Sequence, residues 1–189
     1  MYNVNNYKGN YGVRQENANK DMCIAYVEHH FNSSKSPEAD YTVVVVGSNA
    51  SKTSCDWGRW YAKAVAKEFN VPVGGDKGIL VGGYKGRGNA NLRFTNMPAI
   101  LVEPLFASNP KHVGWICSEQ GQLRLAQVLR DSICHFFPKG GTIGFSVGHK
   151  YKKSRPKDRG AKVFGGGLEA DFAEKVLEKA KNLLEAENP

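Results

Sequence analysis

Short apolar runs alternate along this chain with longer segments in which apolar residues recur every three or four positions. The short runs predict β-strands, and the periodic segments predict amphipathic helices. The strand candidates are residues 2–5, 22–28, 41–46, 98–102 and 142–147, and the helix candidates are residues 54–69, 118–137 and about 169–187. This order of elements predicts an α/β fold, in which a twisted, mostly parallel sheet of about six strands is flanked by helices.

Length and charge narrow the class of protein. The chain has 189 residues, which suits one domain over residues 1–189 with a substantial core. Its longest apolar runs are about as short as Val43–Val46, so we expect no membrane insertion. The formal net charge of +8 favours a polyanionic partner, such as nucleic acid, acidic lipid or an anionic cell-wall polymer. Two glycine-rich and basic stretches, residues 74–88 and 150–167, predict exposed loops.

Polar residues with metal-binding chemistry follow three of the predicted strands: His29 and His30, Glu103, and His149. Because ligands bind at the carboxyl ends of parallel strands, we expect these side chains to meet at one edge of the sheet. Glu169 opens the last helix after three glycines and would face the same place. Two histidines and a carboxylate make a metal site with an open position, and a further carboxylate would serve as base. Taken alone, each residue also fits an ordinary role as a hydrogen-bonded histidine or a helix-start glutamate.

Two segments carry a resemblance to a known family. Residues 97–110, MPAILVEPLFASNP, are similar to the PAxLVExxFxSNP motif of the amidase-3 family of zinc-dependent N-acetylmuramoyl-L-alanine amidases. Residues 21–33, DMCIAYVEHHFNS, resemble the aDlxxSiHxNa segment of the same family. On these matches Glu103 takes the position of the family's catalytic carboxylate, and His30 takes that of a zinc ligand, with Asn32 following it.

A third block of the family stands at the other end of the chain. Family members begin with a strand, a GH pair, a DxGA segment and a glutamate that opens the first helix. Here the similar segments are residues 143–149 (IGFSVGH), residues 158–161 (DRGA) and Glu169. The chain therefore resembles a circularly permuted amidase-3 domain, in which residues 142–189 supply the block that is N-terminal in the family. Permutation at exposed loops is physically tolerated.

The resemblance implies both a cofactor and a reaction. Zn²⁺ would be held by His30, His149 and Glu169, with water in the fourth position. Glu103 would accept a proton from that water and pass it to the leaving amine. The bond cut would be the amide between N-acetylmuramic acid and L-Ala of the peptidoglycan stem peptide.

The chain departs from the family pattern near its second block. Glu28 stands where the family has serine, and two adjacent histidines, His29 and His30, leave the identity of the ligand open. The spacing to Asn32 favours His30, and Glu28 lies on the same side of an extended strand, where it would support that ring. Arg14, in a segment that resembles the family's R…AN motif, is expected to be a structural support.

The N-terminus shows no apolar segment typical of a secretory signal. With the resemblance, this implies a phage endolysin that is made in the host cytoplasm and acts on the bacterial cell wall as a monomer. Three alternatives stay open: a related zinc amide hydrolase such as a deacetylase or carboxypeptidase, a non-catalytic wall-binding module, and a nucleic-acid-binding module. The last would use the basic loop at residues 150–162 for phosphate contacts, and the family resemblance implies no such specific partner.

Overall fold

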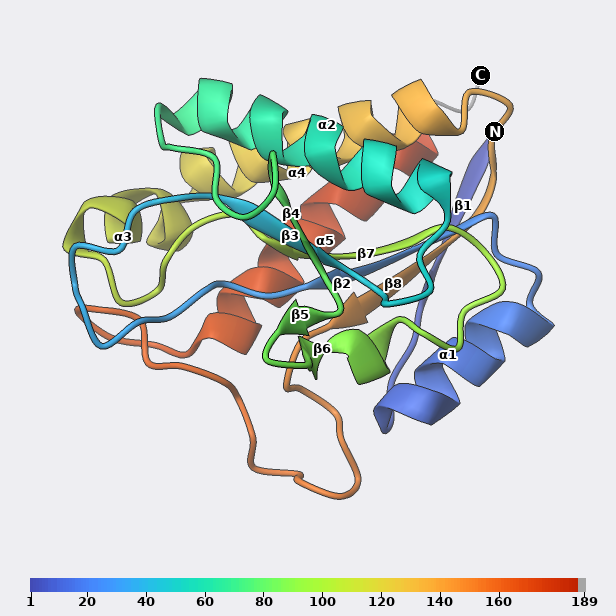
Figure 1. Ribbon diagram of the computed structural model, residues 1–189, viewed down its shortest axis with the longest axis horizontal. Coiled ribbons are helices and arrows are strands. Elements are labelled where there is room, and N and C mark those ends of the chain that lie inside the picture. The colour runs from blue at the N-terminus through green and yellow to red at the C-terminus, as the bar shows by residue number, and fades with distance from the viewer. Residues whose placement is uncertain (187–189) are drawn as a thin grey trace.

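A central sheet lies between helices α2, α4 and α5 on one face and α1 on the other (Figure 1). This computed structural model describes residues 1–186. In spatial order the strands are β1 (Tyr2–Asn6), β8 (Gly141–Val147), β2 (Ala25–His29), β7 (Ala99–Glu103), β3 (Val43–Val46) and β4 (Ile79–Val81). The helices are α1 (Tyr11–Lys20), α2 (Lys52–Phe69), α3 (Pro110–Cys117), α4 (Glu119–Phe136) and α5 (Glu169–Ala186). A small hairpin, β5 (Gly83–Tyr84) and β6 (Arg87–Gly88), precedes the short 3-10 helix η1 (Asn89–Asn91).

Four neighbouring strands, β1, β8, β2 and β7, run in the same direction. In contrast, β3 runs antiparallel to β7, and β4 is parallel to β3. The register places His29 of β2 beside Val147 of β8 and Val102 of β7. The carboxyl ends of these three strands therefore meet at one edge of the sheet, which is where ligands bind in folds of this class.

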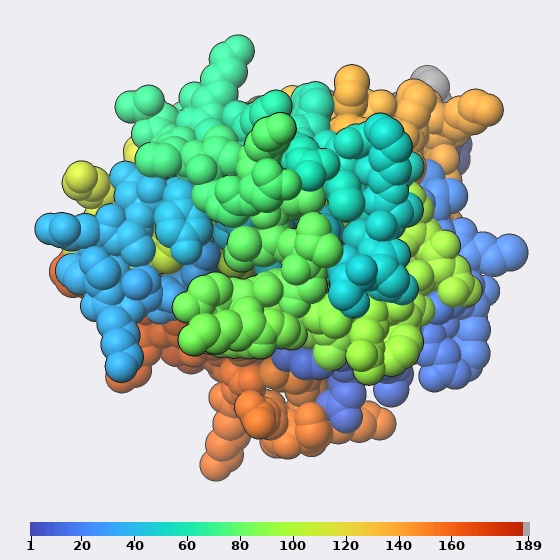
Figure 2. Space-filling model, viewed as in Figure 1, coloured from blue at the N-terminus to red at the C-terminus, as the bar shows by residue number. Residues whose placement is uncertain are grey.

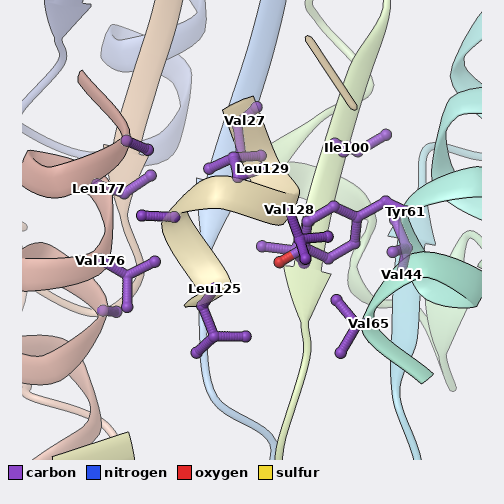
Figure 3. Packing of buried hydrophobic residues seen from close by; sticks show 14 of the residues in the cluster. Val27, Val44, Tyr61, Val65, Ile100, Leu125, Val128, Leu129, Val176 and Leu177 are labelled. Carbon is purple, nitrogen blue, oxygen red and sulfur yellow. The ribbon is translucent and has the colours of Figure 1, made fainter. Parts of the chain in front are cut away.

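Apolar side chains fill the space between the sheet and helices α2, α4 and α5. Figure 3 shows Val27, Val44 and Ile100 of the sheet facing Leu129 of α4 and Val176 of α5. All of these residues are fully buried. A smaller apolar cluster packs the opposite face of the sheet near α1. This packing holds the strands, and with them the segments that leave their ends, in fixed positions.

The predicted α/β class and mostly parallel sheet are confirmed, and all of the predicted strands and helices are present. Three starting points were wrong. β3 begins at Val43 and not at residue 41, because Thr42 makes only an isolated bridge to Val73. β2 begins at Ala25 and not at residue 22, because Met22 has a φ of 52° and lies in the turn after α1. α2 begins at Lys52 and not at residue 54, since Ser51 caps it: the Ser51 hydroxyl accepts a hydrogen bond from the backbone amide of Ser54. The predicted last residue of α5, Glu187, lies outside the described residues.

The sequence analysis missed α1, α3 and the β4 strand. α1 buries Arg14, Gln15 and Ala18, so it carries no apolar stripe from which a helix is predicted. β4 has three residues and lies within the stretch 74–88 that was expected to be a loop. The other expected loop, residues 150–167, is confirmed and contains no helix or strand. Among residues 1–186, no helix is both long and apolar enough to cross a membrane.

Candidate metal centre

Three strand ends and one helix start bring four polar side chains to the same edge of the sheet. His30 directly follows β2, Glu103 is the last residue of β7, and His149 follows β8 after Gly148. Glu169 is the first residue of α5 and is almost fully buried. The parallel directions of β2, β7 and β8 therefore bring these residues to one edge, as expected.

Two imidazoles and one carboxylate lie within coordinating range of a common point. His30 Nδ1 is 3.2 Å from Glu169 Oε1, and His149 Nε2 is 3.3 Å from the same oxygen. The two rings meet edge to face, with 4.9 Å between their centroids. One potential ligand atom from each residue lies within 4.8 Å of the other two. Three such protein ligands leave a further position of a tetrahedral ion open, which is typical of catalytic zinc sites.

The charges of this cluster favour a cation. Burial disfavours the charged ring of His30, but its hydrogen bonds to Glu169 and Glu28 outweigh burial and raise its pKa to about 10. Burial also opposes the charged carboxylate of Glu169, yet the two histidines lower its pKa to about 2. Imidazole nitrogen and carboxylate oxygen are suitable ligands for Zn²⁺, so the residues present fit that ion.

Each histidine also contacts a second carboxylate through its other ring nitrogen. His30 Nε2 lies 2.8 Å from Glu28 Oε1, and His149 Nδ1 lies 2.9 Å from Asp158 Oδ1. Burial opposes ionisation of Asp158, but a hydrogen bond from Lys152 helps to lower its pKa to about 2. Such contacts fix the ring orientation and select which nitrogen faces a metal ion.

Glu103 lies near this cluster without belonging to the coordinating group. Its side chain interacts electrostatically with His30, His149, Glu169 and Arg87. Burial is the main cause that raises the pKa of Glu103, and the Glu169 carboxylate raises it further. A carboxylate that is close to the site but holds no ligand contact is free to exchange a proton.

The two adjacent histidines lie on opposite faces of the sheet. His29 is fully buried, and its ring packs edge to face against Phe31 with 5.1 Å between the two ring centroids. Within residues 1–186, neither of its ring nitrogens has a hydrogen-bond partner, and burial lowers its pKa to about 3. His30, whose ring lies beside His149 and Glu169, is therefore the histidine that this geometry brings to the centre.

Gly148 leaves room for the His30 ring. A methyl group at this position would overlap the imidazole of His30. Gly148→Ala is expected to weaken Zn²⁺ binding about 10- to 100-fold, because loss of the contacts that orient a metal-ligating histidine has effects of that size. Zinc affinity, measured by competition with a chromophoric chelator, checks this. The matched control is Gly114→Ala in α3, where the methyl group meets open space and zinc affinity should not change; equal affinities would contradict the prediction.

The basic loop at residues 150–162 begins directly after His149 and forms the lower edge of the view in Figure 2. Lys150 and Lys152 pair with acidic side chains of α5 and of the loop. Lys153, Arg155 and Lys157 are exposed and make no ion pair among residues 1–186. The loop thus presents free positive charge beside the candidate centre.

Sequence reasoning did not find two residues that support the centre, Asp158 and Asn91. Asp158 lies in the DRGA segment and was assigned no role of its own, although an acidic residue shortly before Glu169 was a usable signal. Asn91 donates a hydrogen bond to Glu28 from η1. Nothing in the sequence around Asn91 indicates that contact.

Residues 1–135 match the model of the family described as Amidase_3, N-acetylmuramoyl-L-alanine amidase. A search of curated proteins found no match. β8 and α5 lie outside the range that the family model matches. Several solved structures are also similar to this chain.

Two of these structures illustrate the similarity. The catalytic domain of CwlV, an N-acetylmuramoyl-L-alanine amidase from Bacillus (Paenibacillus) polymyxa var. colistinus, has 27% identity and a TM-score of 0.56. The alignment covers 68% of this chain and 66% of that one. An N-acetylmuramoyl-L-alanine amidase from Clostridium difficile 630 has 24% identity and a TM-score of 0.58, over 70% of this chain and 67% of that one, which supports the fold.

Proposed function

Because the chain belongs to the Amidase_3 family of N-acetylmuramoyl-L-alanine amidases, we propose that it is a zinc-dependent peptidoglycan hydrolase. The bond cleaved is the amide between N-acetylmuramic acid and L-Ala of the stem peptide. The observation that carries the proposal is the convergence of His30, His149 and Glu169, with Glu103 beside them.

Each side chain has a separate role in this reaction. His30, His149 and Glu169 would hold the zinc ion, and the bound ion would act as a Lewis acid toward water and the scissile carbonyl. Glu103 accepts the proton of the attacking water and delivers it to the departing amine of L-Ala. The raised pKa of Glu103 suits a group that must both take and return a proton.

Mass spectrometry of a peptidoglycan digest tests the reaction. We expect free stem peptides that begin with an L-Ala amine, intact glycan strands and no new reducing ends. Loss of acetyl groups would instead indicate a deacetylase, and release of C-terminal residues from the stem would indicate a carboxypeptidase. An unchanged digest by a protein that contains no zinc would favour a non-catalytic wall-binding module.

We also propose that residues 1–189 form one catalytic domain in permuted order. Three observations support this proposal. β8 lies between β1 and β2 although it is the last of the described strands in the chain, and the family match ends before it. The Val4 amide donates to Glu185 Oε1 at 3.1 Å, so the end of α5 lies against β1. The Gly141 amide donates to Met1 O, so the start of β8 lies beside the N-terminus.

A relinked chain is expected to keep the fold. Joining Pro189 to Met1 through a short glycine–serine linker and opening the chain between Lys139 and Gly140 restores the order of the family. Because the break lies in a turn, we expect the relinked chain to fold and to keep its zinc binding. Circular dichroism and zinc titration check this. A relinked chain that folds but binds no zinc would contradict the permutation.

The finer proposal is an endolysin role. The exposed cations beside the candidate centre, Lys153, Arg155 and Lys157, suit an anionic bacterial wall. Expression in a bacterial cytoplasm, with and without a co-expressed membrane pore, tests this role. Lysis that requires the pore is the expected result, and lysis without it would oppose the role.

A further inference from the structure

A buried ion pair lies behind the candidate metal centre, on the side of His30 away from Glu169. Neither Glu28 nor Arg14 has exposed surface, and Arg14 Nη1 lies 3.6 Å from Glu28 Oε2. A buried pair of this kind is weak evidence for stability, since apolar residues of similar volume often replace one without loss. The two charges are better explained by the groups that they hold in place.

Glu28 is held on both of its oxygens. Oε1 accepts hydrogen bonds from His30 Nε2 at 2.8 Å and from the side-chain amide of Asn91. Oε2 accepts one from Ser146 Oγ at 3.3 Å. A carboxylate with this many donors has little freedom to move. Its contact with Nε2 keeps the proton of a neutral His30 ring on that nitrogen, so the lone pair lies on Nδ1, the nitrogen that faces Glu169.

Arg14 holds the backbone on both sides of the other histidine. Its guanidinium donates to Val147 O at 2.7 Å, to Lys150 O and to Ser146 Oγ at 2.6 Å. Between these points His149 has a φ of 60°, a left-handed conformation that few non-glycine residues adopt. Strained backbone of this kind persists where surrounding contacts fix it, and Arg14 supplies two of them, to Val147 O and Lys150 O.

We propose that Glu28 and Arg14 are positioning residues, which together present Nδ1 of His30 and Nε2 of His149 to one metal ion. This inference rests on the proposed zinc site and adds to it residues that touch neither metal nor substrate. From the family resemblance serine is usual at position 28, so Glu28 departs from that pattern.

The experiment uses the full chain with zinc binding and ring tautomers as readouts. Zinc affinity is measured by chelator competition. Long-range ¹H–¹⁵N spectra of the zinc-loaded chain report which nitrogen of His30 carries the proton, because without the metal ion the raised pKa of His30 keeps both nitrogens protonated at neutral pH. Glu28→Ala is expected to weaken zinc binding about 10- to 100-fold and to remove the single Nε2–H tautomer. Glu28→Gln, whose amide oxygen still accepts a hydrogen bond, should restore much of the affinity. Arg14→Lys should also weaken binding.

Gln15→Ala is the matched control. Gln15 is fully buried on the same helix as Arg14 and bonds to Ala90 O and to the Phe94 amide, away from both histidines. The Gln15→Ala substitution should lower the unfolding temperature and leave zinc affinity unchanged. If the Glu28 and Arg14 variants behave as this control does, the pair is structural and the inference is wrong. If the unmodified chain binds no zinc, the proposed function fails as well, so the two failures are distinguishable.

Discussion

Glu103→Gln is expected to lower the rate of peptidoglycan hydrolysis by about 10²- to 10⁴-fold, which is the range for loss of a general acid–base group. Glutamine keeps the size and shape of the side chain but neither accepts nor returns a proton. Because Glu103 is outside the coordinating group, bound zinc should stay at the level of the unmodified chain. Release of stem peptides and zinc content are measured on the same preparation.

The control for this substitution is Glu68→Gln. Glu68 lies on α2 and pairs with Arg124, so it supplies a carboxylate of the same chemistry outside the candidate centre. Its replacement should leave hydrolysis unchanged. Full activity of Glu103→Gln would show that another group moves the proton, whereas loss of zinc would show that Glu103 supports the ion and is not only a base.

Much of the candidate centre could be predicted because several of its residues stand at the ends of strands. Short, nearly continuous apolar runs such as Val43–Val46 identify strands that are covered on both faces, and the polar residue after such a run marks the strand's end. His30 and Glu103 follow from this reasoning directly. The choice between His29 and His30 also follows from local geometry, since neighbouring residues of a strand face opposite sides.

The supporting contacts were beyond that reasoning because they join distant parts of the chain. Arg14 bonds to Ser146 and to the backbone of Val147, more than 130 positions away. Glu28 was expected to lie near His30, but its contacts with Arg14 and Asn91 come from α1 and η1, neither of which was predicted. The buried face of α1 is mostly polar, so apolar periodicity does not predict this helix.

Topology explains how the end of the chain reaches the middle of the sheet. β8 pairs in parallel with both β1 and β2, so Val147 comes to lie beside His29. Parallel pairing requires a long connection and not a tight turn, and the segment from residue 30 to residue 140 provides it. His149 and Glu169 are therefore brought to His30 by strand order, independently of their distance in sequence.

Glu169→Gln is expected to remove zinc and, with it, hydrolysis. Glu169 contributes the carboxylate that His30 and His149 both contact. Its Oε2 also accepts a hydrogen bond from the backbone amide of Ala161 at 2.7 Å. An amide side chain is a poor substitute for an anionic ligand, so the zinc-dependent gain in stability should be lost. At zinc a thousandfold above its dissociation constant that gain is about 4 kcal/mol. For a chain of this length it raises the unfolding temperature by on the order of 10 °C.

Thermal unfolding with and without zinc measures this difference, and Asp171→Asn is its matched control. Asp171 lies on the same turn of α5 and pairs with Lys150 and Arg159, not with the histidines. The control should keep the zinc-induced rise in unfolding temperature, and Glu169→Gln should lose it. If Glu169→Gln kept that rise, Glu169 would not be a zinc ligand. The permuted assignment of Glu169 would then be wrong, even with Glu103 confirmed as the base.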